Sequence, residues 1–370
     1  MKRKSNFLPD FLCLSVCVML ISATVLGSSF FGDTAKSVLS LYSDFKGELV
    51  TGEVSVNKSN SESGNIVFSS GGYDVGIEPT ASLTETPDDV LALMKDAESM
   101  YKNFKKSGNI DEQHMGATSQ TVTYGSVMVN NKAGENIDIK ALLDSAPDFS
   151  AVTKEKPYVL IYHTHTTEGY ELLDKGWYSD DYNSRTKDSS RNMVRVGDAI
   201  AEQLENAGYG VIHDTNVYDS SYNGAYDRSR KSVEKYLEEY PSIQITLDVH
   251  RDAIHYDSGT KCKPTAEING KKAAQVMIIS GCEGEGVENF PDWKKNLSFA
   301  VALQSSVEER FEGLMRPIFF CHRKYNMDVT TSSLLLEFGT DANTLEEAVY
   351  SGTLVGKALS DMLDKGINKE

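Results

Sequence analysis

From Lys156 to the end of the chain, short apolar runs alternate with longer amphipathic stretches. The runs have the length of buried strands, and the stretches between them repeat apolar residues at helical spacing. Strands that alternate with helices in this way are typical of α/β layer folds. We therefore expect residues 156–370 to form one α/β unit, in which helices cover both faces of a mostly parallel or mixed sheet.

The strands and helices of this unit can be assigned one by one. We expect strands at residues 158–162, 210–214, 243–250, 275–280, 317–320 and 334–338. We expect helices to begin near Met193, Tyr226 and Leu297. A last helix should follow Thr344, because Thr344 and Glu347 have the spacing of a capping box.

An apolar segment without charge lies near the start of the chain, at residues 11–31, after the basic residues 2–4. A helix of this length spans the hydrocarbon core of a bilayer, at ~1.5 Å rise per residue. Basic residues stay on the cytoplasmic side, so everything after Asp33 would be exported. We predict a retained single-pass anchor at residues 1–33, with a cleaved signal peptide as the alternative.

Two further segments separate this anchor from the α/β unit. Much of residues 34–87 is rich in Ser, Gly, Asn and Thr, which is typical of a flexible tether. Residues 88–155 contain a predicted helix at 88–105 and a predicted strand at 121–129. We interpret residues 88–155 as a small N-terminal subregion.

Charge and cysteine content exclude several classes of function. The chain carries 37 Lys and Arg residues against 54 Asp and Glu residues, which gives a formal net charge of −17. Proteins that bind nucleic acid cluster Lys and Arg on one surface, so we expect no nucleic-acid partner. The exported part has Cys262, Cys282 and Cys321 but no CxxC pair, which excludes a disulfide framework and a thiolate zinc site. The sequence allows one disulfide between two of these three cysteines but does not select the pair.

Polar side chains gather at the ends of three predicted strands. They are His163, His165 and Glu168 after the first strand, His250 at the end of the third, and Glu337 near the end of the last. Ligands bind beyond the carboxyl ends of strands in open α/β sheets, so we expect these side chains to converge on one site. Two imidazoles and a carboxylate match a catalytic zinc site that keeps its fourth position open.

Each of these residues also has a structural interpretation. A lone histidine at a strand end is usually a hydrogen-bonded loop residue, but histidines and carboxylates at corresponding positions of three strands favour a metal. Glu337 suits the general base for an attacking water, because partial burial raises the pKa of a carboxyl group toward the working range. We interpret His213 as a structural or supporting residue. Arg251 and Asp252 would either orient ligands or form a loop ion pair.

Several motifs, in this order along the chain, resemble one known family. They are YHTHTTEGY at 162–170, RNMVRVGDAIAEQL at 191–204, GYGVIHDTNVYD at 208–219, LDVHRDA at 247–253 and LLLEFGTDANTLEEA at 334–348. With these motifs the chain resembles the stage II sporulation protein P family, which comprises membrane-anchored cell-wall hydrolases of endospore-forming bacteria. The resemblance covers residues 156–370 and extends more weakly to about residue 90.

The resemblance implies an activity, a location and partners. The family is similar to zinc-dependent N-acetylmuramoyl-L-alanine amidases, which cleave the peptidoglycan amide between N-acetylmuramic acid and L-alanine. It is also associated with cleavage of peptide crosslinks. The resemblance implies action during engulfment, outside the cytoplasm, in the space between mother cell and forespore. The implied partners are the stage II sporulation proteins D and M.

The family pattern also implies roles for individual residues. It assigns two zinc ligands to His165 and His250 and the catalytic base to Glu337. The helix that begins near residue 191 lacks the glutamate that usually supplies the remaining ligand. We assign that ligand to Glu168, because His165 and Glu168 have the HxxE spacing of zinc carboxypeptidases of related architecture. His163 is the alternative.

Two other functions compete with an amidase. A zinc endopeptidase that acts mainly on crosslinks would use the same site. A degenerate wall-binding scaffold would recruit partner hydrolases without zinc, and the missing helix glutamate motivates this alternative. The sequence leaves these functions open, together with the oligomeric state.

Overall fold

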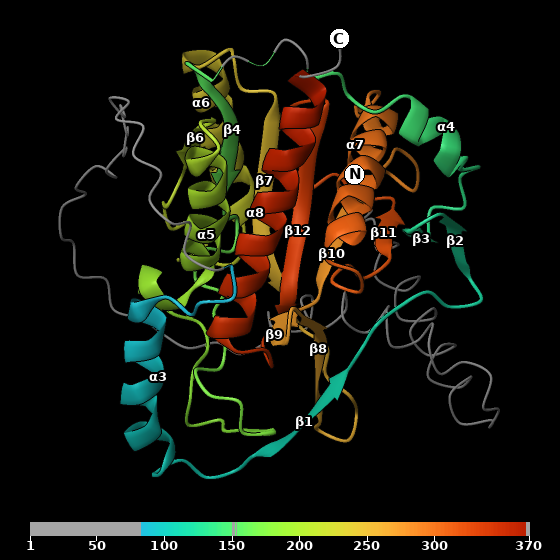
Figure 1. Ribbon diagram of the computed structural model, residues 1–370. Coiled ribbons are helices and arrows are strands. Elements are labelled where there is room, and N and C mark those ends of the chain that lie inside the picture. The colour runs from blue at the N-terminus through green and yellow to red at the C-terminus, as the bar shows by residue number, and fades with distance from the viewer. Residues whose placement is uncertain (1–82, 150–151, 153, 368–370) are drawn as a thin grey trace, which may run out of the picture. The chain divides into compact units, whose positions relative to one another are not determined.

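The fold is built around a mixed sheet of eight strands (Figure 1). The computed structural model describes residues 83–149, 152 and 154–367. Along the sheet the strands follow the order β2-β3-β11-β10-β12-β7-β4-β6. Their bounds are β2 (Thr121–Tyr124), β3 (Val127–Asn131), β4 (Pro157–Tyr162), β6 (Gly210–His213), β7 (Ile245–Asp252), β10 (Val276–Gly281), β11 (Ile318–Cys321) and β12 (Ser332–Thr340).

The strands that carry the predicted site residues lie together in this sheet. β12, β7, β4 and β6 are parallel neighbours, whereas β10 runs antiparallel to β12. All six strands predicted for residues 156–370 are present, and the sheet is mixed. The central strands are buried on both faces, which is why their sequences are almost continuously apolar.

A second sheet of four strands has the order β5-β1-β8-β9. Its strands are β1 (Gly108–Gln113), β5 (Trp177–Tyr178), β8 (Lys261–Ile268) and β9 (Lys271–Ala274). The sequence did not predict this sheet, because β8 carries charged residues and a proline where a buried strand would be apolar. One of them, Lys263, is only 1% exposed and pairs with Glu347 at 2.7 Å and Asp174 at 3.0 Å.

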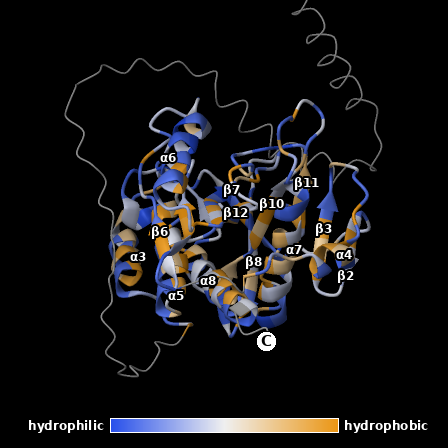
Figure 2. Ribbon diagram, turned by 90° about the horizontal axis from the view of Figure 1, so that it is seen from above, coloured by the Kyte–Doolittle hydropathy of each residue, from blue (hydrophilic) through white to orange (hydrophobic). Residues whose placement is uncertain are grey.

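Helices cover both faces of the large sheet, as predicted (Figure 2). They are α3 (Asp88–Tyr101), α4 (Ile139–Asp144), α5 (Met193–Asn206), α6 (Ala225–Glu239), α7 (Trp293–Arg310) and α8 (Leu345–Ile367), with a short 3-10 helix η2 (Ser189–Arg191). α5, α7 and α8 lie on one face and α6 lies on the other. Successive residues of β4 therefore serve two cores: Val159 and Ile161 join the larger one, and Leu160 packs with Val233 of α6.

The predicted capping box is present at the start of α8. The Glu347 amide donates to Thr344 Oγ1 at 3.2 Å, and the Thr344 amide donates to Glu347 Oε2 at 3.0 Å. α8 then lies directly against α5, because Gly352 has no side chain to separate the two helices. A Cβ atom at Gly352 would lie 2.8 Å from the Val196 carbonyl oxygen.

The segment 88–155, expected as a small subregion, shares strands with both sheets. β1 pairs with β8, and β3 pairs with β11. The single strand predicted at 121–129 is wrong: β2 and β3 form a hairpin, which turns at Gly125 with a φ of 59°.

The predicted anchor at 1–33 and nearly all of the predicted tether at 34–87 lie outside the described residues. Among the residues that the structure describes, no helix combines the length and the apolar character that a bilayer crossing requires.

Candidate functional site

The register of the large sheet brings two of the predicted site residues side by side. β12 and β7 are paired so that Glu337 lies opposite His250. Both residues lie within their strands, as expected, and each strand continues two residues beyond its predicted end. In register, the two side chains project from the same face of the sheet.

The turn after β4 supplies the other predicted ligands. The Glu168 amide donates to the His165 carbonyl at 3.0 Å, so the HxxE segment closes on itself and brings both side chains to one place. The His165 and His250 ring centroids are 5.3 Å apart, with ring planes at 85°. Glu168 Oε2 lies 3.4 Å from His250 Nδ1. His165, Glu168 and His250 are all buried, and we call them the donor cluster.

The charge states of His165 and Glu168 suit a metal. Burial lowers the pKa of His165, although Glu168 opposes the shift, so its imidazole is neutral at neutral pH. Burial alone would raise the pKa of Glu168, but His250, His165 and Arg185 together hold it well below its ordinary value. A neutral imidazole and an ionised carboxylate are the forms that bind zinc.

Asp248 is part of the site and was missed at the sequence level. Its Oδ1 lies 2.7 Å from His250 Nε2, and its Oδ2 accepts from the Thr164 hydroxyl at 2.7 Å. Burial opposes the charged form of His250, but Asp248 and Glu168 raise its pKa well above the ordinary value. Asp248 and His250 are two residues apart on one strand and so share a face, which is the signal that could have identified Asp248.

His163, the alternative ligand, has both ring nitrogens engaged elsewhere. Its Nδ1 lies 2.9 Å from the Val249 carbonyl oxygen, and its Nε2 lies 2.8 Å from His213 Nε2. His213 in turn pairs with Asp198 through Nδ1 at 3.0 Å. Of the two candidates for the remaining ligand, these contacts favour Glu168.

Arg185, also missed at the sequence level, connects Glu168 to a neighbouring loop. It donates to Glu168 Oε1 at 3.2 Å and to Asp219 Oδ2 at 3.1 Å. Its guanidinium lies 5.8 Å from the ring centroid of Tyr222, and Tyr222 stacks on His165 at 4.6 Å. Arg185 therefore contacts one member of the donor cluster directly and a second through Tyr222.

The structure separates the roles of Arg251 and Asp252. The Arg251 main-chain amide donates to Glu168 Oε2 at 3.3 Å, so this residue helps to orient the carboxylate. The Asp252 side chain pairs instead with Arg316 at 3.0 Å. Arg251 therefore contacts the donor cluster, whereas Asp252 forms an ion pair from within β7.

The donor cluster fits zinc in the kind of its donors, two imidazoles and a carboxylate. His165 Nδ1 is buried and has no hydrogen-bond partner, as a nitrogen kept for a metal would be. Among the described residues, however, no three His, Cys, Asp or Glu side chains are arranged around a common metal position. The fit is therefore one of chemistry and proximity.

Cys262, Cys282 and Cys321 are buried free thiols, so the possible disulfide is not formed.

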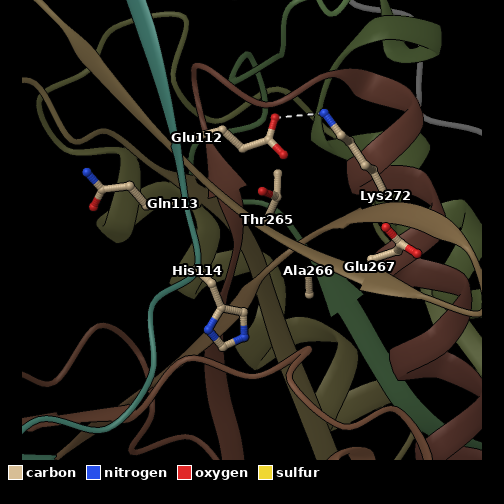
Figure 3. A pocket seen from close by; sticks show the side chains of 7 residues that line it. All are labelled: Glu112, Gln113, His114, Thr265, Ala266, Glu267 and Lys272. Atoms are coloured by element: carbon tan, nitrogen blue, oxygen red, sulfur yellow. Dashed lines mark hydrogen bonds and ion pairs between the residues drawn. The ribbon is translucent and has the colours of Figure 1, made fainter.

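A pocket of about 290 Å³ lies elsewhere, against β1, β8 and β9 (Figure 3). It is lined by Glu112, Gln113, His114, Thr265, Ala266, Glu267 and Lys272. Lys272 donates to Glu112 Oε2 at 2.7 Å across it, and Glu112 also lies 3.6 Å from Lys263. None of the lining residues belongs to the donor cluster.

Comparison with known sequences identifies similar proteins. The family model described as stage II sporulation protein P (SpoIIP) matches residues 78–360. Stage II sporulation protein P of Bacillus subtilis (strain 168) is 32% identical over 222 residues, which cover 57% of this chain and 52% of that protein. The chain thus spans about half the length of this curated relative.

Comparison with solved structures finds partial likenesses. The CwlD amidase of Clostridioides difficile, solved in complex with the GerS lipoprotein, is 13% identical with a TM-score of 0.35, over 56% of this chain and 99% of that chain. The N-acetylmuramoyl-L-alanine amidase AmiC2 of Nostoc punctiforme is 9% identical with a TM-score of 0.30, over 59% and 98%. A metallo-carboxypeptidase of Burkholderia cenocepacia is 9% identical with a TM-score of 0.31, over 60% of each chain.

Proposed function

The chain belongs to the stage II sporulation protein P family, and on that basis we propose that it is a zinc-dependent peptidoglycan hydrolase of sporulation. One observation carries the proposal: His165, Glu168 and His250 are buried together, with Glu337 beside His250 in the sheet. A buried group of two imidazoles and a carboxylate, with a second carboxylate next to it, is the donor set of a zinc hydrolase.

The proposed reaction is hydrolysis of the amide that joins N-acetylmuramic acid to L-alanine. The proposed setting follows from the family: the enzyme acts during engulfment, outside the cytoplasm, held to the cell membrane by a single N-terminal helix. Stage II sporulation proteins D and M are the proposed partners. Cleavage of peptide crosslinks is the alternative reaction at the same site.

In the proposed mechanism, His165, Glu168 and His250 would hold a zinc ion, which would supply Lewis acidity toward the scissile carbonyl. Asp248 orients His250 through Nε2 and leaves Nδ1 facing Glu168. Arg185 and the Arg251 amide hold the Glu168 carboxylate ionised and in place. Glu337 removes a proton from the attacking water and returns it to the leaving amine, so the carboxylate is regenerated.

Zinc stoichiometry tests the ligand assignment. The full chain should contain about one zinc, and the His165→Ala and Glu168→Gln variants should lose it. His163→Asn is the matched control, because His163 makes its own hydrogen bonds to Val249 and His213, and this variant should retain zinc. Circular dichroism confirms that each variant is folded. A wild-type chain without zinc would favour the scaffold alternative, and loss of zinc only from His163→Asn would reassign the ligand.

A further inference from the structure

Tyr226 lies between the two histidines of the donor cluster and the loop that precedes β12. It is the second residue of α6. Its ring meets His165 edge-on, with centroids 5.6 Å apart at 85°, and lies nearly parallel to His250, at 6.4 Å and 10°. Tyr325 also stacks against Tyr226, with the two ring centroids 5.1 Å apart. One tyrosine ring therefore contacts both imidazoles of the donor cluster.

The loop that carries Tyr325 is fixed against α6. Asn326 Nδ2 donates to the Tyr226 carbonyl and to Ser229 Oγ, both at 3.1 Å. Tyr325 and Asn326 have φ angles of 41° and 58°, in the left-handed region that costs free energy for residues other than glycine. Strain of this kind persists where the surroundings require one conformation, and here the conformation places Tyr325 against Tyr226.

The Tyr226 hydroxyl carries its proton at neutral pH, because the ordinary pKa of tyrosine is about 10. Its ring stands against both imidazoles of the donor cluster, which places the phenol beside the reacting groups. Tyr226 is only partly buried. A neutral phenol beside the reacting groups can donate a hydrogen bond without giving up its proton.

We propose that Tyr226 is a further catalytic residue, whose hydroxyl donates a hydrogen bond to the carbonyl oxygen of the scissile amide as that oxygen gains negative charge. This inference rests on the proposed function. The water oxygen forms a bond to the carbonyl carbon, and the C–N bond breaks. One water proton moves through Glu337 to the leaving nitrogen, and Tyr226 keeps its own proton throughout. A donor that acts mainly in the transition state raises kcat more than it changes substrate binding.

The Tyr226→Phe variant of the full chain tests this role, because it removes the hydroxyl and keeps the ring between His165, His250 and Tyr325. We expect kcat on peptidoglycan to fall about 10²- to 10³-fold, as for the loss of one oxyanion donor. KM, zinc content and the unfolding midpoint should stay unchanged. Tyr236→Phe is the matched control: it removes the same atom from a tyrosine of α6 that packs in the smaller core, and should keep wild-type kcat.

Each other outcome overturns the inference in a different way. Wild-type kcat in Tyr226→Phe would show that the hydroxyl is not used. Loss of zinc from Tyr226→Phe would make Tyr226 a positioning residue for the histidines instead. A wild-type chain that neither binds zinc nor cleaves peptidoglycan would overturn the proposed function together with this inference, so the two failures can be distinguished.

Discussion

At the scale of single residues, the site depends on carboxylates that set the state of their neighbours. Asp248 contacts His250 Nε2, and Thr164 holds Asp248 through its main-chain amide and its hydroxyl. A carboxylate in this position fixes which imidazole nitrogen faces a metal and makes that nitrogen a better ligand. Asp248 should therefore influence zinc affinity without touching zinc.

The Asp248→Asn variant tests this role. An amide keeps an acceptor for Thr164 but removes the negative charge beside His250. We expect zinc affinity to weaken about 10- to 100-fold, measured by competition with a chromophoric chelator. Asp252→Asn is the control on the same strand, because Asp252 pairs with Arg316, and it should leave the affinity unchanged. Equal affinities for wild type and Asp248→Asn would contradict the assignment.

A second buried carboxyl, Glu171, should make stability depend on pH. Burial raises its pKa from 4.5 to about 7, although the Tyr101 hydroxyl donates to it at 2.5 Å and opposes the shift. The folded chain then binds more protons than the unfolded chain between these values. Stability from this group is therefore fully present below about pH 4.5 and is lost as pH rises through about 7.

The Glu171→Gln variant should remove this pH dependence. The free energy of unfolding of wild type, relative to that of the variant, should fall by at most about 3 kcal/mol between pH 4.5 and pH 8. Urea unfolding at several pH values measures it. Glu98→Gln, at an exposed position on α3, should retain the wild-type slope. If the free energy of unfolding of Glu171→Gln kept the pH dependence of wild type, the pKa of Glu171 would be the same in the folded and unfolded chains.

At the scale of elements, the contact between α5 and α8 depends on small residues. Gly352 has no room for a methyl group, because the nearest atom is a main-chain oxygen that cannot move aside easily. Alanine would otherwise be favoured over glycine inside a helix by about 1 kcal/mol. The sign of the stability change in Gly352→Ala therefore shows whether overpacking or helix propensity prevails.

We expect Gly352→Ala to destabilise the fold by about 1–3 kcal/mol, because overpacking outweighs helix propensity at this site. Chemical denaturation measures the change. Thr353→Ala, one position along α8 and only partly buried, should cost less than the Gly352 substitution. If Gly352→Ala left the stability unchanged or increased it, α5 and α8 would be able to move apart without loss of stability.

Elements with a clear apolar period could be predicted, and those defined by distant contacts could not. β4, β7 and β12 were predicted from their apolar runs, and α8 from its capping box. β8 escaped prediction because Lys263 is buried only through pairing with Glu347 and Asp174, which lie far away in the sequence. Its pairing with β1 also joins segments about 150 residues apart.

At the scale of the whole molecule, the sequence predicted more of the candidate site than of the segments that surround it. His165, Glu168, His250 and Glu337 were predicted to meet, and the parallel order of β4, β7 and β12 brings them together. Arg185 and Tyr226 could not be predicted, because they reach the site from a long loop and from a helix of the opposite layer. The placement of such segments depends on tertiary packing, which leaves no local pattern in the sequence.

The masses of the products released from purified peptidoglycan test the central claim most directly. The full zinc-loaded chain should release intact stem peptides with a free L-alanine amino group and leave glycan strands with bare lactyl groups. Glu337→Gln should release about 10²- to 10⁴-fold less, as expected for loss of a general base. Trimmed peptides still attached to muramic acid through L-alanine would contradict the amidase assignment. No release at all would contradict the hydrolase itself.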